Sequence, residues 1–283
     1  MTDTSLIKLG DLGKPAIVLI EKISDAIGGV FKPYQIVRVA KAEAEAERIR
    51  AEAQIEVADL HRRALHRFFE EEAKRQSNIE EIIAKALPDL REKASPQDVQ
   101  DDWITNFFDK CRIVSDQDMQ RLWSRVLAGE ANNPGAFSRR TVNLLADLDM
   151  RDAKLFTSLC GFDWVLGGIH VPLIFDLKAE IYNRSEINFA SVSHLESFGL
   201  IHVSTPGGFS LSIASKKMTV YYYGKHLELA FPDANNELQV GHVRLTVAGE
   251  ELAQICGSMP VEGFYDFVYE HWKRLVAGPQ TEG

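Results

Sequence analysis

The sequence DDWITNFFDKCRIVSDQDMQRLWSRVLAGE, residues 101–130, carries the clearest structural pattern in this chain. Its apolar residues recur three or four positions apart, which places their side chains on one face of an α-helix. The residues expected on this face are Trp103, Phe107, Phe108, Cys111, Met119, Leu122, Trp123, Val126 and Leu127. The polar run at 115–118 is expected to cap the second of two helices. We therefore predict two amphipathic helices that pack together in the core of a helical bundle.

Capping residues also mark the other helices of this bundle. Ser95, followed by proline, predicts a helix start, because serine is a favoured N-cap and proline fits the first helical turn. Ser138 is expected to cap a third helix, and a fourth is predicted from Arg151 to about Leu166, with Trp164 on its apolar face. We expect residues 95–168 to form this compact helical domain.

Residues 35–94 differ in composition, because alanine, glutamate, arginine and lysine dominate from position 35 to about 87. These residues are strong helix formers, and balanced charges of both signs are typical of a solvated helix surface. The larger apolar residues form an incomplete stripe rather than a coiled-coil seam. Such a helix buries little surface by itself. We therefore expect a long helical arm that pairs with another helix or with its own copy, and hence a homo-oligomer.

The N-terminal segment, residues 1–34, is predicted to contain a short amphipathic helix. The apolar residues that we expect to mediate association are Ile20, Ile23, Ile27 and Val30. Charged residues interrupt the segment, so it lacks the roughly 20 apolar residues that a membrane-spanning helix needs. We expect this face to dock on the chain's own core or on a neighbouring subunit. Peripheral contact with a membrane is the alternative, although interfacial helices favour a strongly basic polar face.

Residues 169–283 combine helical and strand-like patterns and resemble a winged-helix module. A short helix is expected at 188–198, ended by Gly199, and several runs that alternate at period two follow it. A last pair of helices is expected from Thr246 to the C-terminal region. The short helix at 188–198 would be the recognition helix of a winged helix, yet it contains neither arginine nor lysine. Because base and phosphate contacts depend on such residues, we expect association with protein rather than with DNA.

Composition restricts the possible partners and the compartment. The net charge of −9 would repel nucleic acid unless basic groups were gathered on one face. The three cysteines, Cys111, Cys160 and Cys256, lie far apart in the sequence and are expected to be buried, reduced thiols. The first residues lack the features of a secretory signal. We expect a soluble cytoplasmic protein, and a location at the periphery of the inner membrane is the alternative.

Motifs of the common enzyme classes are missing from the sequence. It has no phosphate-binding loop, no nucleophile elbow and no His-Glu-x-x-His helix. The spacing of His61 and His66 does not suit a metal site, so we predict no metal, no cofactor and no enzymatic activity. The cluster Ser138, Arg139 and Arg140 is the one candidate anion site, since helix N-termini attract anions. A simple cap with surface arginines is the alternative.

Several motifs resemble an uncharacterised bacterial family of unknown-function domains. These motifs are residues 102–108 (DWITNFF), 115–130 (SDQDMQRLWSRVLAGE), 134–141 (PGAFSRRT) and 245–252 (LTVAGEEL). More distantly, the layout is similar to the Abi-alpha abortive-infection proteins, through residues 11–15 (DLGKP), the alanine- and glutamate-rich helix and residues 126–128 (VLA). The first resemblance implies no mechanism, whereas the second implies a role in defence against phage.

We therefore expect a mainly α-helical protein with a C-terminal α+β part, built from a long N-terminal helical arm, a central helical bundle and a winged-helix-like module. Its expected function is non-enzymatic association, as a sensor or effector of antiphage defence that meets a phage or host protein. The alternative is a housekeeping adaptor or winged-helix regulator without a role in immunity.

Overall fold

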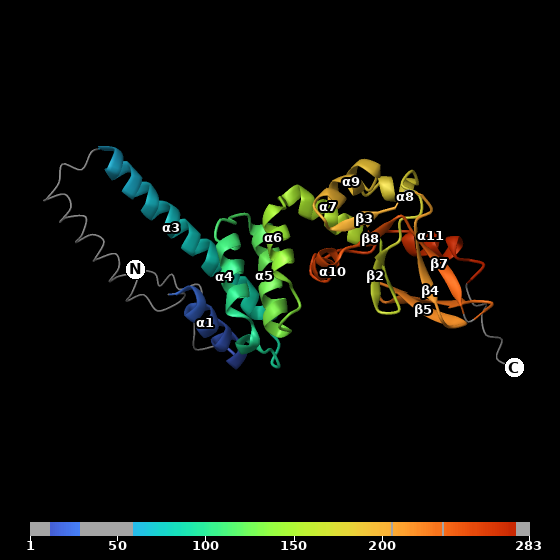
Figure 1. The fold of residues 1–283 in the computed structure, drawn as a ribbon, viewed down its shortest axis with the longest axis horizontal. Coiled ribbons are helices and arrows are strands. Elements are labelled where there is room, and N and C mark those ends of the chain that lie inside the picture. The colour runs from blue at the N-terminus through green and yellow to red at the C-terminus, as the bar shows by residue number, and fades with distance from the viewer. Residues whose placement is uncertain (1–11, 29–58, 205, 234, 276–283) are drawn as a thin grey trace. The chain divides into compact units, whose positions relative to one another are not determined.

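The chain divides into two compact units in a computed structural model that describes residues 12–28, 59–204, 206–233 and 235–275. The division falls between Val142 and Asn143, within helix α6 (Arg139–Asp147). The described part of the first unit is helical, and the second unit combines helices with antiparallel strands (Figure 1). These findings confirm a mainly helical chain with a C-terminal α+β part. Residues 35–58 of the predicted arm lie outside the described residues.

The first unit is a bundle built around two helices that the sequence analysis predicted. Its described elements before α6 are α1 (Lys14–Ile27), α3 (Asp59–Ala86), the 3-10 turns η2 (Leu87–Asp89) and η3 (Pro96–Asp98), α4 (Asp101–Cys111) and α5 (Gln117–Asn132). Helix α3 packs along α5, and α1 packs against α4 and η3. Helices α4 and α5 therefore lie at the centre, where their aromatic faces meet.

An aromatic cluster fills the centre of this bundle. The ring of Phe107 stacks on Trp103 at a centroid distance of 5.0 Å and meets Trp123 edge-on at 5.1 Å. The predicted apolar residues Phe108 and Cys111 are buried on the same helix face. Aromatic pairs of this geometry contribute about 0.5–1.5 kcal/mol beyond the surface that they bury. The helical spacing of residues 101–130 therefore predicted this part of the core correctly.

Helix starts follow the predicted capping chemistry, with one exception. Asp116 caps α5 by accepting hydrogen bonds from the amides of residues 118 and 119, and Ser138 accepts one from the amide of Thr141. The prediction that Ser95 caps a helix is wrong. Its amide donates to the carbonyl oxygen of Ala131, only the short turn η3 follows, and buried Val99 adopts an extended backbone before α4 begins. Burial of Val99 in the bundle thus outweighs the local signal for a helix.

Helix α1 has its predicted apolar face turned toward the bundle of its own chain. Ile20 and Ile23 are buried, Ile27 is half-buried, and Val30 lies outside the described residues. Lys22 forms an ion pair with Asp101 at the start of α4, with 2.6 Å between nitrogen and oxygen. The first alternative of the sequence analysis, docking on the chain's own core, describes this arrangement. The structure holds one chain, so contact of this segment with a neighbouring subunit stays a prediction.

The second unit contains short helices and strands that alternate along the chain. Its described elements after α6 are α7 (Met150–Cys160), β1 (Asp163–Leu166), β2 (Ile169–Pro172), α8 (Glu180–Asn183), α9 (Phe189–Ser197), β3 (Ile201–Val203), β4 (Phe209–Ile213), β5 (Lys217–Tyr222), β6 (Lys225–Ala230), β7 (Asn236–Gly241), β8 (Val243–Leu245), α10 (Val247–Ala253) and α11 (Phe264–His271). Asn188 caps α9, and the Thr246 hydroxyl caps α10, as predicted for the latter.

The prediction that a helix extends from Arg151 to Leu166 is wrong. Helix α7 ends at Cys160, and Trp164 lies in strand β1, where it is fully buried. The side chains of β1 alternate between half-buried and buried positions, which is the period of a strand. The apolar residues of the short run 162–166 are compatible with the period of a helix and with that of a strand. Pairing with β2 and β5 makes this segment a strand.

Antiparallel pairing organises all the named strands. One sheet has the order β2-β1-β5-β6, and its β5–β6 hairpin turns at Tyr223 and Gly224, which both have positive φ angles of 43° and 82°. Two further pairs are β3 with β8 and β4 with β7. Strands β3 and β4 are consecutive in one chain segment, and strands β7 and β8 are consecutive in the other. The β5–β6 hairpin is therefore inserted between β4 and β7 and pairs back onto β1.

Helix α10 approaches β3 so closely that only glycine fits at position 249. A Cβ atom added to Gly249 would lie 2.1 Å from the carbonyl oxygen of Leu200. In an isolated helix, alanine is favoured over glycine by about 1 kcal/mol. Here the clash with a backbone atom outweighs that preference, because neither segment can move without breaking the hydrogen bond from the Thr246 amide to the same oxygen.

We therefore predict that Gly249→Ala destabilises the second unit by about 1–3 kcal/mol, the usual cost of overpacking. Denaturant unfolding followed by tryptophan fluorescence measures the change. Gly13→Ala is the matched control, since its φ is −64° and the nearest atom would lie 3.8 Å away. Equal stability of the two variants would contradict the close approach.

Candidate functional site

The N-terminal half of α3 presents large apolar side chains to solvent. We call these four residues the α3 patch: Leu60, Leu65, Phe68 and Phe69, with exposed fractions of 64%, 51%, 58% and 52%. The rings of Phe68 and Phe69 contact each other edge-on at a centroid distance of 5.8 Å. Single exposed apolar residues are common on protein surfaces, but a cluster on one helix marks a candidate interaction site.

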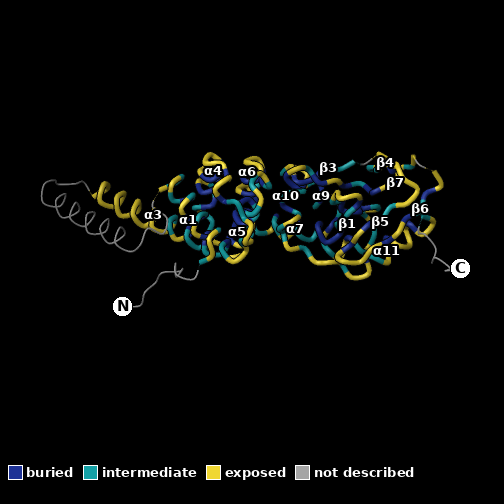
Figure 2. The backbone as a smooth tube through the Cα atoms, turned by 90° about the horizontal axis from the view of Figure 1, so that it is seen from below, coloured by how far each residue is buried: buried dark blue, intermediate teal, exposed yellow. Residues whose placement is uncertain are grey.

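The position of α3 explains why this half of the helix is exposed. Its C-terminal half packs on α5 through Ile79, Ile82 and Ile83, and Asn78 donates a hydrogen bond to the carbonyl oxygen of Arg112. The N-terminal half extends past the end of α5, and Figure 2 shows this part of α3 as exposed. The bundle therefore anchors one half of the helix and leaves the α3 patch uncovered by the other described elements of the first unit.

Charged residues of both signs surround the α3 patch in separate groups. Arginines occupy positions 62, 63 and 67, and glutamates occupy positions 70–72. Within the helix these groups form exposed ion pairs, such as Arg67 with Glu71 at 3.2 Å. Exposed pairs of this kind contribute only about 0.3–0.5 kcal/mol each, so they can exchange partners at little cost. The basic group therefore precedes the acidic group along α3, although Asp59 pairs with Arg62 and Arg63 at the start of the helix.

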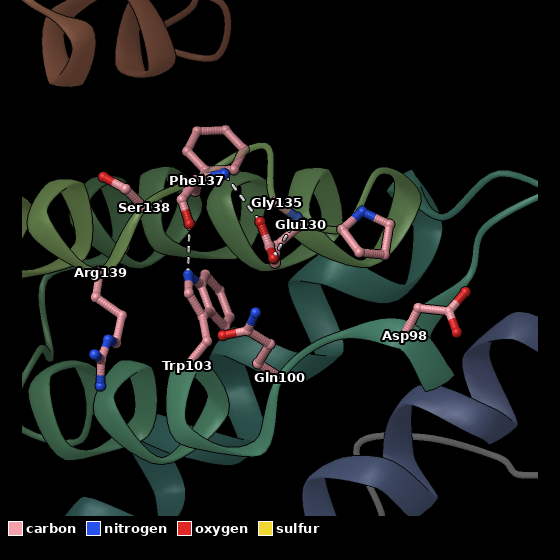
Figure 3. A pocket seen from close by; sticks show the side chains of 9 residues that line it. Asp98, Gln100, Trp103, Glu130, Gly135, Phe137, Ser138 and Arg139 are labelled. Atoms are coloured by element: carbon pink, nitrogen blue, oxygen red, sulfur yellow. Dashed lines mark hydrogen bonds between the residues drawn. The ribbon is translucent and has the colours of Figure 1, made fainter.

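A second candidate site is a polar hollow in the first unit, beside the start of α6 (Figure 3). Its volume is about 320 Å³, and its lining residues are Asp98, Gln100, Trp103, Glu130, Pro134, Gly135, Phe137, Ser138 and Arg139. The indole nitrogen of Trp103 donates to the carbonyl oxygen of Phe137 at 2.7 Å. The hollow therefore lies between α4 and the loop that joins α5 to α6.

The buried carboxylate of Glu130 holds this loop in place. Its two oxygens accept hydrogen bonds from the amides of Gly135 and Phe137, at 2.8 and 2.9 Å. These bonds satisfy the charge that burial would otherwise penalise. Asp98 and Arg139 carry opposite charges and lie at opposite ends of the hollow in Figure 3. With Glu130 included, the lining contains two carboxylates and one cation, so negative charge is in excess.

The predicted anion site is only partly reproduced by this geometry. Ser138 and Arg139 line the hollow, whereas Arg140 is exposed and is not among the lining residues. The Ser138 hydroxyl lies 3.0 Å from that of Thr141 and caps α6. Because two carboxylates also line the hollow, an anion at Ser138, Arg139 and Arg140 stays a prediction with no further support from the electrostatics.

A half-buried acid–histidine pair in the second unit was not predicted from the sequence. One carboxylate oxygen of Asp163 in β1 bonds Nδ1 of His170 in β2, and the two residues lie in facing strands of one hairpin. Burial raises the pKa of Asp163, and the hydrogen bond to Asp163 raises the pKa of His170, with a further contribution from Glu250. No local pattern indicated this pair, because β1 was predicted as the end of a helix and the pairing of β1 with β2 was not foreseen.

Metal and membrane sites were also sought among the described residues. In the described ranges, histidine, cysteine, aspartate and glutamate nowhere gather in groups of three that could hold a metal ion. Among the described helices, none combines the length and the apolar character that crossing a membrane requires.

The Asp163–His170 pair predicts a pH dependence of stability. His170 binds its proton more tightly in the folded state than in the unfolded chain, where its pKa is near 6.5. Its stabilising contribution is therefore complete below pH 6.5 and is lost as the pH rises through the higher folded pKa. We expect the free energy of unfolding to decline across this window, and His170→Gln to reduce the decline.

Equilibrium denaturation at a series of pH values measures this effect. His202→Gln, at an exposed position of β3, is the control and should retain the wild-type dependence. A His170→Gln profile parallel to that of the wild type would refute the role of the pair.

Comparison with known proteins gives a family and no function. The model of the family described as "Protein of unknown function (DUF2806)" matches residues 62–269, which is most of the chain. No curated protein and no solved structure shows significant similarity to the chain. The chain belongs to the DUF2806 family of proteins of unknown function.

Proposed function

We propose that this protein is a non-enzymatic association protein, and that it self-associates through the α3 patch. The observation that carries this proposal is the exposure of Leu60, Leu65, Phe68 and Phe69 on a helix whose other half is anchored in the bundle. When two such faces cover each other, apolar surface is removed from water, which stabilises the pair by about 25 cal/mol for each Å² buried. The charges on α3 favour a second copy of the chain as the partner that covers the α3 patch.

The charge pattern of α3 suits an antiparallel pair of its own copies. In a pair whose two-fold axis passes between positions 66 and 67, Arg62 lies level with Glu71 of the second helix. The same register places Leu65 level with Phe68. A two-fold interface repeats each contact twice, so the basic and acidic groups would pair at both ends of the apolar centre. A parallel pair would instead place like charges together.

A role in antiphage defence, as a sensor or effector, is part of the same proposal. It rests on the resemblance to Abi-alpha proteins in the sequence motifs, and it assigns the second unit to contact with a phage or host protein. Peripheral membrane contact would require the face of α1 that carries Ile20 and Ile23, which are buried on the chain's own bundle. We therefore propose a protein partner.

The alternative function is that of a housekeeping adaptor or winged-helix regulator. Its support is the order of elements in the second unit, where α9 precedes β3, β3 pairs with β8, and the amide of His242 before β8 donates to the carbonyl oxygen of Ile174. A helix followed by an antiparallel strand pair, with one bridge from the segment before the helices, is similar to the layout of a winged helix. Helix α9 has no lysine or arginine, and Phe189 is exposed on it, which favours a protein ligand over DNA.

We predict that Phe68→Asp weakens self-association by at least about 100-fold. Each dimer loses two buried rings worth about 1.5–3 kcal/mol each, and every 1.4 kcal/mol changes the dissociation constant tenfold. Sedimentation equilibrium across a range of concentrations measures the constant. Ile113→Asp is the matched control, because Ile113 is also exposed in the first unit but lies outside α3. A monomeric wild type would refute self-association.

Charge exchange tests the proposed register. Arg62→Glu should weaken the dimer, and adding Glu71→Arg to the same chain should restore it, because both members of each pair are reversed. Adding Glu92→Arg instead should give no restoration, since Glu92 is an exposed glutamate beyond the end of α3. Restoration by both second substitutions would indicate a general effect of charge and contradict this register.

The defence role is tested by plaque counts on bacteria with and without the gene across a broad phage panel. Fewer plaques with the wild-type gene, and wild-type plaque numbers with the Phe68→Asp variant, are the expected results. Unchanged plating for every phage would favour the housekeeping alternative. Binding of labelled duplex DNA at low salt would support the winged-helix regulator instead.

A further inference from the structure

Two cysteines that are 96 positions apart in the sequence have interacting side chains in the second unit. Cys160 is the last residue of α7, and Cys256 lies in the turn that follows α10. The side chains of the two cysteines interact, and both cysteines are free thiols. The Cys256 thiol also lies 3.4 Å from the carbonyl oxygen of Ala253. Their separation in the sequence conceals this interaction.

Two tyrosines of strand β5 and its turn hold the cysteine segments together. The Tyr222 hydroxyl donates to the carbonyl oxygen of Gly161 at 2.8 Å and accepts from the amide of Val261 at 2.7 Å. The Tyr223 hydroxyl lies 3.0 Å from the carbonyl oxygen of Cys160 and 2.6 Å from the Ser258 hydroxyl. Each tyrosine thus bridges the end of α7 and the segment after α10. The contact between the thiols is therefore fixed by the fold on both sides.

The two thiols differ in exposure and in acidity. Cys160 is 2% exposed, and burial raises its pKa well above the ordinary value. Cys256 is only half-buried, and the hydrogen bond from Cys160 lowers its pKa to about 7, although burial and Asp163 act in the opposite direction. A thiolate is the reactive form of cysteine. Cys256 therefore has the properties of the attacking thiol, and Cys160 those of the thiol that reacts second.

We propose that Cys160 and Cys256 form a reversible dithiol site that reacts with low-molecular-weight disulfides, such as oxidised glutathione. In the first step the Cys256 thiolate attacks one sulfur of the disulfide, forms a mixed disulfide and releases one glutathione thiolate. In the second step the Cys160 sulfur loses its proton to that thiolate and attacks the Cys256 sulfur, which releases the second glutathione. Two protein thiols are thus oxidised to one disulfide while one glutathione disulfide is reduced to two thiols.

A soft metal ion is a weaker candidate for this pair. Structural metal sites with thiolate ligands use four protein ligands in most cases, and none of the described histidines or carboxylates completes such a set with these cysteines. The acidity of Cys256 and its partial exposure instead match the features of redox-sensitive cysteines, which lie next to a second thiol that resolves the first product. The reaction is independent of self-association through α3, so the two proposals are tested separately.

The test exposes the reduced full-length protein to oxidised glutathione, alkylates the free thiols with iodoacetamide in denaturant and measures the intact mass. The reduced chain should take up three alkyl groups, and the oxidised chain one, at Cys111. Peptide mapping without reduction should recover a Cys160–Cys256 link. Excess reduced glutathione should return the chain to three alkyl groups. This measurement needs no substitution, so it does not depend on a variant that folds.

Cysteine variants separate the two steps. Cys160→Ser should accumulate the mixed disulfide at Cys256, whereas Cys256→Ser should leave Cys160 unmodified, because buried Cys160 cannot meet the disulfide directly. Cys111→Ser is the matched control, as Cys111 is fully buried in the other unit, and it should still form the link. The alkylation rate of Cys256 in the native chain should rise with pH around its pKa of about 7.

Three outcomes would overturn the proposal. The first is uptake of three alkyl groups after prolonged exposure to oxidised glutathione. The second is a stable mixed disulfide on wild-type Cys256, which would show that Cys160 does not resolve it. The third is a peptide map in which Cys111 pairs with either cysteine, because that link requires unfolding of the first unit.

Discussion

The second unit depends most on the side chain of Tyr222 and on the two hydrogen bonds of its hydroxyl. It ties the end of α7 to the segment before α11 through Gly161 and Val261, while its ring stacks on Trp164 and contacts Phe264 edge-on. Burial raises the pKa of this hydroxyl to about 12, so it stays protonated and keeps both bonds throughout the physiological range. Segments from both ends of the unit therefore meet at one side chain. The contact between Cys160 and Cys256 follows from this arrangement.

The first unit depends on a different constraint, which is the limited length of α5. A helix is stabilised in a protein mainly where its apolar face has a partner. Residues 79–86 of α3 have such a partner in α5, and the residues that precede Gln76 do not. The exposed half carries large apolar side chains in spite of this, together with separate basic and acidic groups. Surface of this kind is costly to leave in water, and this cost is the basis of the proposed association through α3.

Buried acids in this protein are engaged in holding its loops and helices. Glu130 binds two amides of the loop before α6, and Asp152 both accepts from the amide of Asp149 and bonds His194 of α9. Asp163 bonds His170 across a hairpin. Each carboxylate is thus committed to a structural contact, and two of them join elements that are far apart in sequence or in different strands. This use of charge agrees with an association protein, whose units must keep their shape when partners bind.

The sequence by itself determined the helices and their caps, because helical period and capping are local properties. The faces containing Trp103, Phe107 and Trp123, the caps at Asp116 and Thr246, and the turn after Tyr223 all follow from neighbouring residues. Tertiary structure decided what depends on distant partners. Pairing with β5 made a strand of the residues around Trp164, burial of Val99 displaced the helix expected at Ser95, and packing placed Cys160 beside Cys256. These outcomes have no local signal, since each is fixed by contacts between segments that the chain brings together only on folding.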